Sequence, residues 1–177
     1  MGVEIERKFT VKELPKDLEQ YPVHIIEQGY LSVVPAIRVR REDERFYMTY
    51  KSHKDFGKAD GGSSVSGDIG KTEYNLPLDK DSYEHLVAKA DGNVISKKRY
   101  IIPINKDAFD SSDDKLQKVM DSLKIELDVF EGKFEGRILA EVEFPDEETA
   151  AAYKPADWFD EDVTGDVRYS NAHMSTE

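Results

Sequence analysis

The stretch Val3-Glu4-Ile5-Glu6-Arg7-Lys8-Phe9 decides the fold of this protein, because charged and apolar residues alternate along it. Successive side chains of a β-strand point to opposite faces, so Glu4, Glu6 and Lys8 share one face of the predicted strand. The alternation returns in five later stretches, at Arg38 and Arg40, Lys71 and Glu73, Lys97 and Arg99, Glu126 and Asp128, and Glu141 and Glu143. An open sheet would present such faces to water, whereas a closed barrel would turn them inward into a charged tunnel.

Length and composition bound the class of protein. The 177 residues fit one domain of ordinary size, residues 1–177. No apolar run approaches the roughly 18 residues that a membrane-spanning helix needs, so we expect a soluble, cytoplasmic protein with no membrane partner. Cysteine is absent, which excludes disulfides, thiolate nucleophiles and zinc–thiolate sites. Any metal ion must therefore be held by oxygen or imidazole.

The net charge of -12 disfavours a surface that coats nucleic acid, because such binding depends on clustered Lys and Arg. Local charge can still oppose global charge. A cavity lined by basic side chains would bind a small polyanion while an acidic exterior repels larger ones.

Period-two patterns and turn residues predict eight strands in an antiparallel meander. They lie near residues 2–10, 25–34, 36–42, 45–52, 70–77, 94–104, 124–131 and 136–145. Helices are expected over residues 81–90 and 113–123, the second capped by Ser111 or Ser112, and a third after Asp146. The segment 52–70 holds five glycines and several Ser, Asp and Lys residues, so it is expected to be a mobile surface loop. A phosphate cradle is the alternative, but the segment lacks the Gly-Lys-Ser/Thr ending of a P-loop and precedes a strand.

Carboxylates two apart form the first candidate site. Mg²⁺ and Mn²⁺ prefer oxygen ligands and leave coordination positions for water and substrate phosphates. A solvated strand face explains each pair taken alone, but the pairs together favour a site for one or two such ions. The candidate ligands are Glu4, Glu6, Asp128, Glu141 and Glu143.

Basic residues form the second candidate site. Arg presents a planar fork that suits phosphate oxygens, and Lys acts as a compact charge. The alternative is cross-strand salt bridging on an exposed sheet, which contributes little energy. The set comprises Lys8, Arg38, Arg40, Lys51, Lys71, Lys97 and Arg99, joined by Arg168.

The ordered motifs of the chain resemble the CYTH domain, the triphosphate tunnel metalloenzyme superfamily. Its opening Glu-x-Glu-x-Lys signature is met by Glu4, Glu6 and Lys8. Further blocks follow in family order over nearly the whole chain. They are Gln28-Gly29-Tyr30-Leu31, Ile37-Arg38-Val39-Arg40, Thr49-Tyr50-Lys51, Lys97-Lys98-Arg99-Tyr100, Leu127-Asp128-Val129-Phe130, Glu141-Val142-Glu143 and the segment from Asp162 to Asn171.

The resemblance implies an α+β, mainly β fold, an eight-stranded antiparallel β-barrel with helices packed outside, and a role for each matching residue. Glu4, Glu6 and Glu143 would hold the main metal ion, Mg²⁺ or Mn²⁺. Asp128 and Glu141 would lie near a second ion or the attacking water and, with Lys8, would be the catalytic residues. The phosphates would be bound by Lys8, Arg38, Arg40, Lys51, Lys71, Glu73, Lys97, Arg99 and Arg168.

One departure from the family concerns the fifth strand. The family often carries Arg-x-Glu-x-Glu there, whereas this chain reads Lys71-Thr72-Glu73-Tyr74-Asn75. Lys71 keeps the charge without the bidentate fork, and Asn75 removes a carboxylate.

The resulting hypothesis is a metal-dependent triphosphatase whose partner is inorganic tripolyphosphate or another small triphosphate. Water would attack the terminal phosphorus in line, without a covalent enzyme intermediate. The alternatives are a class IV-like adenylate cyclase, a thiamine triphosphatase and a non-catalytic polyphosphate-binding module. The family resemblance also makes a homodimer an option.

Overall fold

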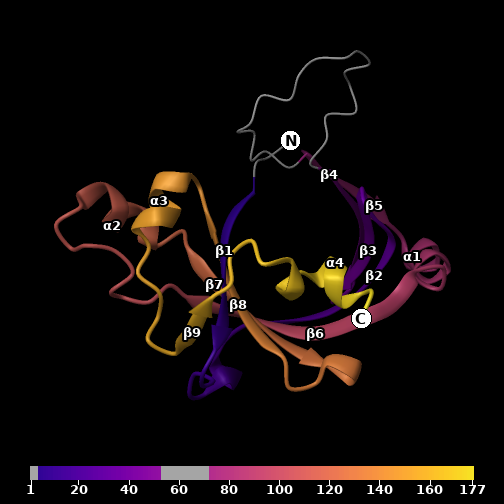
Figure 1. Cartoon of the computed structure of the whole chain (residues 1–177), viewed down its shortest axis with the longest axis horizontal. Coiled ribbons are helices and arrows are strands. Elements are labelled where there is room, and N and C mark those ends of the chain that lie inside the picture. The colour runs from indigo at the N-terminus through magenta and orange to yellow at the C-terminus, as the bar shows by residue number, and fades with distance from the viewer. Residues whose placement is uncertain (1–3, 53–71) are drawn as a thin grey trace, which may run out of the picture. The chain divides into compact units, whose positions relative to one another are not determined.

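A computed structural model describes residues 4–52 and 72–177 of the chain (Figure 1). The described residues form two compact units. The first unit comprises Glu4, Glu27–Val94 and Asn171–Glu177, and the second comprises Ile5–Ile26 and Ile95–Ser170. Strands β2 (Val23–Val33) and β6 (Asp91–Pro103) contribute one part to each unit. The prediction of a single domain over residues 1–177 stays a prediction, and the expected loop at 53–70 lies outside the described residues.

The first unit is built on an antiparallel meander of β2, β3 (Ala36–Glu42), β4 (Arg45–Ser52) and β5 (Thr72–Leu78). Thr49 on β4 is the register partner of both Arg38 on β3 and Asn75 on β5, so the three side chains share one face. Helix α1 (Lys80–Val87) covers part of the opposite face. Its buried Tyr83 ring lies 5.4 Å from the ring of Phe46.

The C-terminal segment of the first unit contains the short helix α4 (Asn171–Met174) and is anchored on the start of β6. The Asn93 backbone N–H donates to the Ser175 carbonyl at 2.7 Å, and the Asn93 side chain donates to the carbonyls of Met174 and Glu177. Gly92 has a φ of 70°, and a Cβ there would lie 2.0 Å from the Ser175 oxygen. A glycine is therefore required for this close approach.

The second unit contains β1 (Ile5–Val11), β7 (Lys124–Glu131), β8 (Ile138–Phe144) and β9 (Phe159–Asp162), in the order β6-β7-β8-β1-β9. The pairs β6/β7, β7/β8, β8/β1 and β1/β9 are antiparallel. Helices α2 (Asp114–Met120) and α3 (Glu147–Ala152) belong to the same unit. Its apolar strand faces form a core that includes Phe9, Leu127, Val142 and Phe159.

Arg7 ties three elements of the second unit together. Its Nη1 donates to the carbonyls of Ala150 at 3.2 Å and Tyr153 at 2.9 Å, at the end of α3. Its Nη2 lies 2.6 Å from Asp162 Oδ2 on β9. A cation beside the last carbonyls of a helix satisfies groups that have no partner within the helix. Arg7 therefore fixes β1, which carries Glu6 and Lys8 on its other face.

The eight predicted strands correspond to β1 through β8, and the three predicted helices to α1, α2 and α3. The predicted serine cap of α2 is wrong. Asp113 is the cap, and its Oδ1 accepts from the N–H groups of Lys115 and Leu116 at 3.0 Å each. Strand β9, helix α4 and three 3₁₀ turns (Leu18–Gln20, Gly132–Phe134 and Val167–Tyr169) were not predicted.

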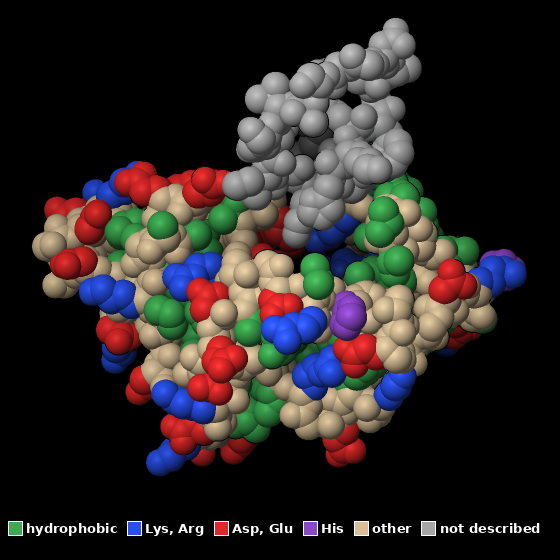
Figure 2. Space-filling model, viewed as in Figure 1, with side chains coloured by type: hydrophobic (Ala, Val, Ile, Leu, Met, Phe, Trp, Pro, Cys, Tyr) green, Lys and Arg blue, Asp and Glu red, His purple; other side chains and the backbone are tan. Residues whose placement is uncertain are grey.

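The surface carries acidic and basic side chains side by side over the visible face (Figure 2). Among the helices described, none has the length and apolarity that crossing a membrane requires.

Candidate active site

The second unit presents a continuous charged face across four strands. The register pairs Arg99 on β6 with Asp128 on β7, and Lys8 on β1 with Glu141 on β8. It also pairs Glu126 with Glu141 across β7 and β8. Because side chains alternate along each strand, all of these residues lie on the face opposite the apolar core. The predicted alternation of charge is thus realised as neighbouring acids and bases.

Asp128 is the hub of this face. Its side chain is 1% exposed and that of Lys97 is 0% exposed. Lys97 Nζ lies 2.5 Å from Asp128 Oδ2, and Arg99 donates to both carboxylate oxygens from Nε and Nη2, each at 2.7 Å. Burial by itself would raise the pKa of Asp128, but the charges of Arg99 and Lys97 outweigh it and hold that pKa below its usual range. Asp128 is therefore an anion enclosed by two cations.

Arg99 is held by three carboxylates. Its Nη2 lies 3.1 Å from Glu141 Oε2, and its Nη1 contacts Glu126 Oε2. Burial would lower the pKa of Arg99, but Asp128 and then Glu141 raise it well above its usual value. Arg99 is thus permanently charged and fixed in orientation.

Glu126 differs from the neighbouring carboxylates, because burial raises its pKa and the charge of Arg99 does not fully offset that effect.

Lys8 and Glu141 form a second close pair. Lys8 Nζ lies 3.0 Å from Glu141 Oε1 and also donates to the Tyr169 carbonyl at 3.4 Å. Burial would lower the pKa of Lys8, but Glu141 and then Glu6 raise it above its usual value. For Glu141 burial would raise the pKa, yet Lys8 and Arg99 lower it strongly. Both residues are accordingly charged at neutral pH.

The segment that follows β9 holds the backbone of Lys8. The Lys8 N–H donates to Thr164 Oγ1 at 3.1 Å, and the Lys8 carbonyl accepts from the Val163 N–H at 2.9 Å. Asp162 Oδ1 in turn accepts from both the N–H and the hydroxyl of Thr164. The family block that begins at Asp162 therefore acts on Lys8 within this unit.

Glu6 and Glu143 are direct register partners across β1 and β8. Glu143 is exposed and Glu6 is half-buried. Like charges at directly opposed positions destabilise a strand pair unless a cation compensates them. The charge of Glu6 contributes to the raised pKa of Lys8, so this carboxylate also belongs to the charged face. Glu6 and Glu143 thus bring two carboxylates to adjacent strands near Lys8.

The first unit carries a different basic cluster, on β3. Arg40 is buried, and its Nε donates to Gln28 Oε1 at 2.8 Å while its Nη1 donates to the Tyr47 hydroxyl at 3.3 Å. Arg38 Nη2 donates to Thr49 Oγ1 at 3.3 Å, and Arg38 Nε is buried without a partner among the described residues. The partners that hold these two arginines are an amide and hydroxyls, not carboxylates.

The pKa of Arg38 is lowered, although its charge is close enough to Glu73 to contribute to the lowered pKa of that carboxyl. Burial is the largest cause, and the neighbouring charge of Arg40 is the next. Tyr30, which hydrogen-bonds Arg38, offsets these effects only in part. Two adjacent guanidinium groups in this environment attract an anion.

Lys51, Glu4 and Glu73 form an ion-pair group in the first unit. Lys51 Nζ lies 2.5 Å from Glu4 Oε2 and 3.3 Å from Glu73 Oε2. Asn75 donates to Glu73 Oε1 at 3.1 Å and accepts from the Thr49 hydroxyl at 2.6 Å. The amide at position 75 therefore links Glu73 to the threonine that contacts Arg38.

One predicted phosphate ligand, Arg168, is paired near the surface, and another, Lys71, cannot be placed. Arg168 is largely exposed and pairs with Asp166, its Nη2 lying 2.6 Å from Asp166 Oδ2. Lys71 lies outside the described residues. Functional side chains that sequence reasoning left without a role are Gln28, Tyr47, Thr49 and Glu126. The alternation of charge had singled out Glu126, and Gln28 and Thr49 lie in blocks that resemble the family, but nothing in the sequence assigned these neutral residues a role.

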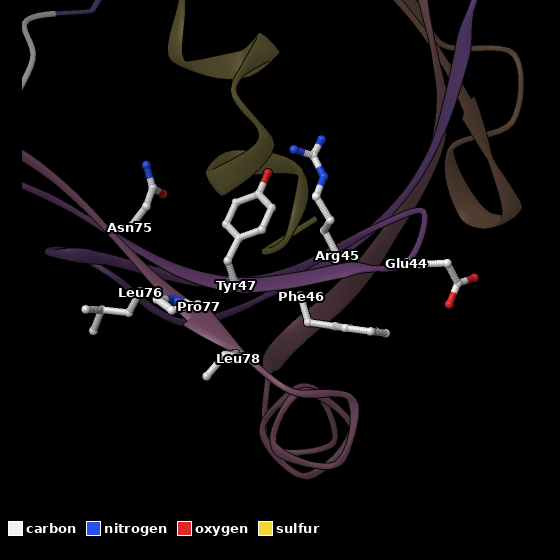
Figure 3. Close-up of a pocket in the computed structure, with 8 residues that line it drawn as sticks. All are labelled: Glu44, Arg45, Phe46, Tyr47, Asn75, Leu76, Pro77 and Leu78. Carbon is white, nitrogen blue, oxygen red and sulfur yellow. The ribbon is translucent and has the colours of Figure 1, made fainter.

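A hollow of about 440 Å³ lies along the antiparallel strands β4 and β5 of the first unit (Figure 3). Arg45 and Tyr47 point to one side of the ribbon, and Phe46 and Leu78 point to the other. The residues that line the hollow thus come from both strands and from both sides of the ribbon. Tyr47 joins it to the basic cluster through Arg40.

Comparison with known proteins places this arrangement in a family. A family model described as CYTH domain matches residues 2–170. Curated inorganic triphosphatases of Nitrosomonas europaea and Acetivibrio thermocellus are 33% and 32% identical to the chain, over 97% and 98% of it and 96% and 94% of their own lengths. The crystal structure of an inorganic triphosphatase covers 100% of this chain and 97% of its own, at 29% identity and a TM-score of 0.66.

A more distant structure supports the fold alone. It belongs to a putative adenylyl cyclase from Hippeastrum, at 15% identity and a TM-score of 0.53, over 84% of this chain and 82% of its own. These similarities confirm the predicted mainly β, antiparallel fold with helices. Closure of the sheet into a barrel stays a prediction.

Proposed function

We propose that this protein, which belongs to the CYTH domain family, hydrolyses inorganic triphosphate with the help of a divalent metal ion. Two curated relatives of nearly the same length carry the name inorganic triphosphatase, and so does a solved structure that the whole chain matches. A relationship over the full length supports transfer of the reaction class, and the side chains of this protein support the substrate class.

The observation that carries the proposal is the Arg38 and Arg40 cluster. Within the described part of the chain, both guanidinium groups are held by neutral partners, and neither forms an ion pair. A buried positive charge without a counterion is costly, so the site favours an anion. Planar guanidinium forks match the oxygens of a phosphate. We assign these two arginines to the phosphates of the substrate.

Lys8 acts in this proposal as a charged donor and not as a base. Its raised pKa keeps Nζ protonated at neutral pH. A protonated amine donates hydrogen bonds to phosphate oxygens and stabilises the charge that develops on them in the transition state. Lys51, Lys97, Arg99, Lys71 and Arg168 would add positive charge, and we retain them as candidate phosphate ligands. Glu73 is retained as a candidate substrate-binding residue that pairs with Lys51.

The carboxylates suit a hard divalent cation. We propose that Glu6 and Glu143, opposed across β1 and β8, hold the ion with Glu4, two residues earlier in the sequence. Among the residues described, no three or more acidic, histidine or cysteine side chains form a ready-made metal site. Phosphate and water oxygens would therefore complete the shell, as is usual around Mg²⁺. When bound, Mg²⁺ or Mn²⁺ would neutralise phosphate charge and lower the pKa of an attacking water.

Glu141 and Asp128 would have different parts in the reaction. Both oxygens of Asp128 accept from Lys97 or Arg99, so we propose that it anchors these two cations. Glu141 binds Lys8 through Oε1 and Arg99 through Oε2. A phosphate that draws Lys8 away would free Oε1 of Glu141 to accept a hydrogen bond from water. We therefore propose Glu141 as the residue that orients the attacking water.

We further propose that the partner is a small triphosphate, with no nucleic acid or membrane involved. The net charge of -12 repels long polyanions, in keeping with this choice. The cytoplasm as location and a homodimer as assembly stay predictions.

The test is product analysis by phosphorus NMR after incubation with tripolyphosphate, ATP or thiamine triphosphate, each with Mg²⁺ or Mn²⁺. In ¹⁸O-labelled water, tripolyphosphate should yield pyrophosphate and orthophosphate, with one solvent oxygen in the orthophosphate. Formation of cyclic AMP and pyrophosphate from ATP, with negligible hydrolysis of tripolyphosphate, would show that the protein is a cyclase and not a hydrolase. Tight binding of tripolyphosphate without turnover would show that it is a binding module.

A further inference from the structure

Gln28 is a fully buried amide on β2 with one unsatisfied donor. Its Oε1 accepts from Arg40 Nε at 2.8 Å, while its Nε2 is buried without a hydrogen-bond partner among the described residues. The orientation of the amide is fixed, because an arginine Nε only donates and must therefore face the oxygen. Buried polar groups are normally hydrogen-bonded, so a buried glutamine whose amide nitrogen forms no hydrogen bond requires an explanation.

A carboxylate would satisfy Arg40 better than an amide does. Glutamate has nearly the size of glutamine, has no idle donor, and forms a stronger, charge-assisted hydrogen bond with guanidinium. The second unit uses such a partner, since Asp128 binds both Lys97 and Arg99. The chain thus contains a buried arginine whose partner is an acid, and another whose partner is neutral.

The nearby carboxylate of Glu42 is also kept from contact with Arg40. The Tyr47 hydroxyl accepts from Arg40 Nη1 and donates its own proton to Glu42 Oε2 at 2.8 Å. Glu42 Oε1 is taken by Arg45 Nη2 at 3.1 Å. A phenol therefore stands between the guanidinium and the acid. Arg40 is held at Nε and Nη1, and its Nη2 donates to no described residue.

We propose that Gln28 is a positioning residue for triphosphate binding. Its neutral hydrogen bond fixes the direction of the Arg40 guanidinium. The charge and the Nη2 group of Arg40 then remain able to bind a phosphate oxygen. The inference rests on the proposed function, because it takes the phosphate of that substrate as the anion. The inference explains why residue 28 is a glutamine. Its amide orients the Arg40 guanidinium as a carboxylate would, but does not neutralise the positive charge. Tyr47 has the same effect on Nη1.

The decisive variant is Gln28→Glu, measured by titration calorimetry with tripolyphosphate in EDTA, so that binding is recorded without turnover. The new carboxylate should pair with Arg40, and the Kd for tripolyphosphate should rise roughly tenfold or more while the melting temperature is unchanged or higher. If Gln28 has a purely structural role, the substitution should instead change the melting temperature and leave the Kd for tripolyphosphate unchanged. Gln20→Glu, which adds the same charge at an exposed glutamine, is the matched control and should leave the Kd within about twofold.

Gln28→Met provides the second variant, since it keeps the length of the side chain and removes the acceptor. It should raise the KM for tripolyphosphate more than it lowers kcat, because Arg40 keeps its charge but loses the hydrogen bond that orients its guanidinium. If Gln28→Glu fails to fold, this variant decides, and an unchanged Kd and KM overturn the inference. Equal affinity of folded Gln28→Glu and wild type also overturns it. Failure of the wild type to bind tripolyphosphate instead overturns the proposed function, independently of position 28.

Discussion

Replacing Asp128 with asparagine should destabilise the protein severely without changing its shape. The substitution keeps the size of the side chain but removes the negative charge that faces Lys97, whose side chain is 0% exposed, and Arg99. Arg99 retains its contacts with Glu141 and Glu126. Lys97 keeps an electrostatic attraction to the same two carboxylates but loses the one that lies 2.5 Å from its Nζ. Removing one partner of a buried ion pair costs about 3–5 kcal/mol, because the other charge stays buried. We expect the free energy of unfolding to fall by that amount.

Urea unfolding in EDTA, followed by the fluorescence of Trp158, measures this loss. The control is Glu131→Gln, which breaks the Lys98–Glu131 pair on the adjacent strands, where the two side chains are 44% and 43% exposed. That exposed pair should contribute less than about 1 kcal/mol. Adding Lys97→Met to Asp128→Asn should recover part of the loss, since the buried ammonium that faced Asp128 is then removed as well. A loss in Asp128→Asn no larger than that in the control would refute the reasoning.

The same variant makes a prediction about pH with a defined sign. The folded-state pKa of Asp128 lies below its unfolded value of about 3.9, so its contribution to stability is present above that pH and is lost as the pH falls through the folded value. The difference in unfolding free energy between wild type and Asp128→Asn should therefore be constant from about pH 7 to 5 and shrink below about pH 4. A difference that grew on acidification would contradict the assignment of charge.

Three further changes test the site and the fold. Glu6→Gln should lower turnover of tripolyphosphate on the order of 10²-fold or more at saturating Mg²⁺ with the fold intact, and near-normal turnover in steady-state assays would remove Glu6 from the metal site. Arg38→Ala should weaken binding by roughly 1.5–3 kcal/mol in calorimetry, and unchanged affinity would mean that Arg38 is no phosphate ligand. Gly92→Ala should free the C-terminal segment, because its Cβ meets the Ser175 oxygen at 2.0 Å, and limited proteolysis should then cut that segment faster than in wild type. Equal rates would show that the contact is dispensable.

The strand pattern of this protein could be predicted because two-residue periodicity is a local property of the chain. Alternating charge at Glu6 and Lys8, and again at Glu141 and Glu143, located strands whose register then pairs these residues directly. Strand β9 was missed for the same reason, since Phe159-Asp160-Glu161-Asp162 offers a single apolar residue and no alternation. It forms because Phe159 stacks on Phe9 with ring centroids 4.7 Å apart, a contact 150 residues away in the sequence.

The choice of partner for each charged residue could not be predicted. Alternation indicates which side chains share a face, but not whether a cation meets a carboxylate or an amide. Gln28 belongs to a stretch with no charge pattern, and its contact with Arg40 depends on how β2 and β3 lie in the sheet. The N-cap of α2 could not be predicted either, because Asp113 and the serines next to it are all suitable cap residues, and the structure has Asp113 as the cap.

The difference between the two basic clusters bears on how tripolyphosphate would be recognised. To bind phosphate, Lys97 and Arg99 must share or give up the oxygens of Asp128, so part of the new interaction energy offsets an ion pair already present. Arg38 and Arg40 hold no such pair among the described residues, and their hydrogen bonds to neutral groups leave their charge undiminished. Neither guanidinium must therefore give up a hydrogen bond to an acid in order to bind an anion. Affinity should depend mainly on the arginines with neutral partners, whereas the acid-paired cations contribute a fixed geometry and a rigid charged face on which Lys8 and Glu141 are held.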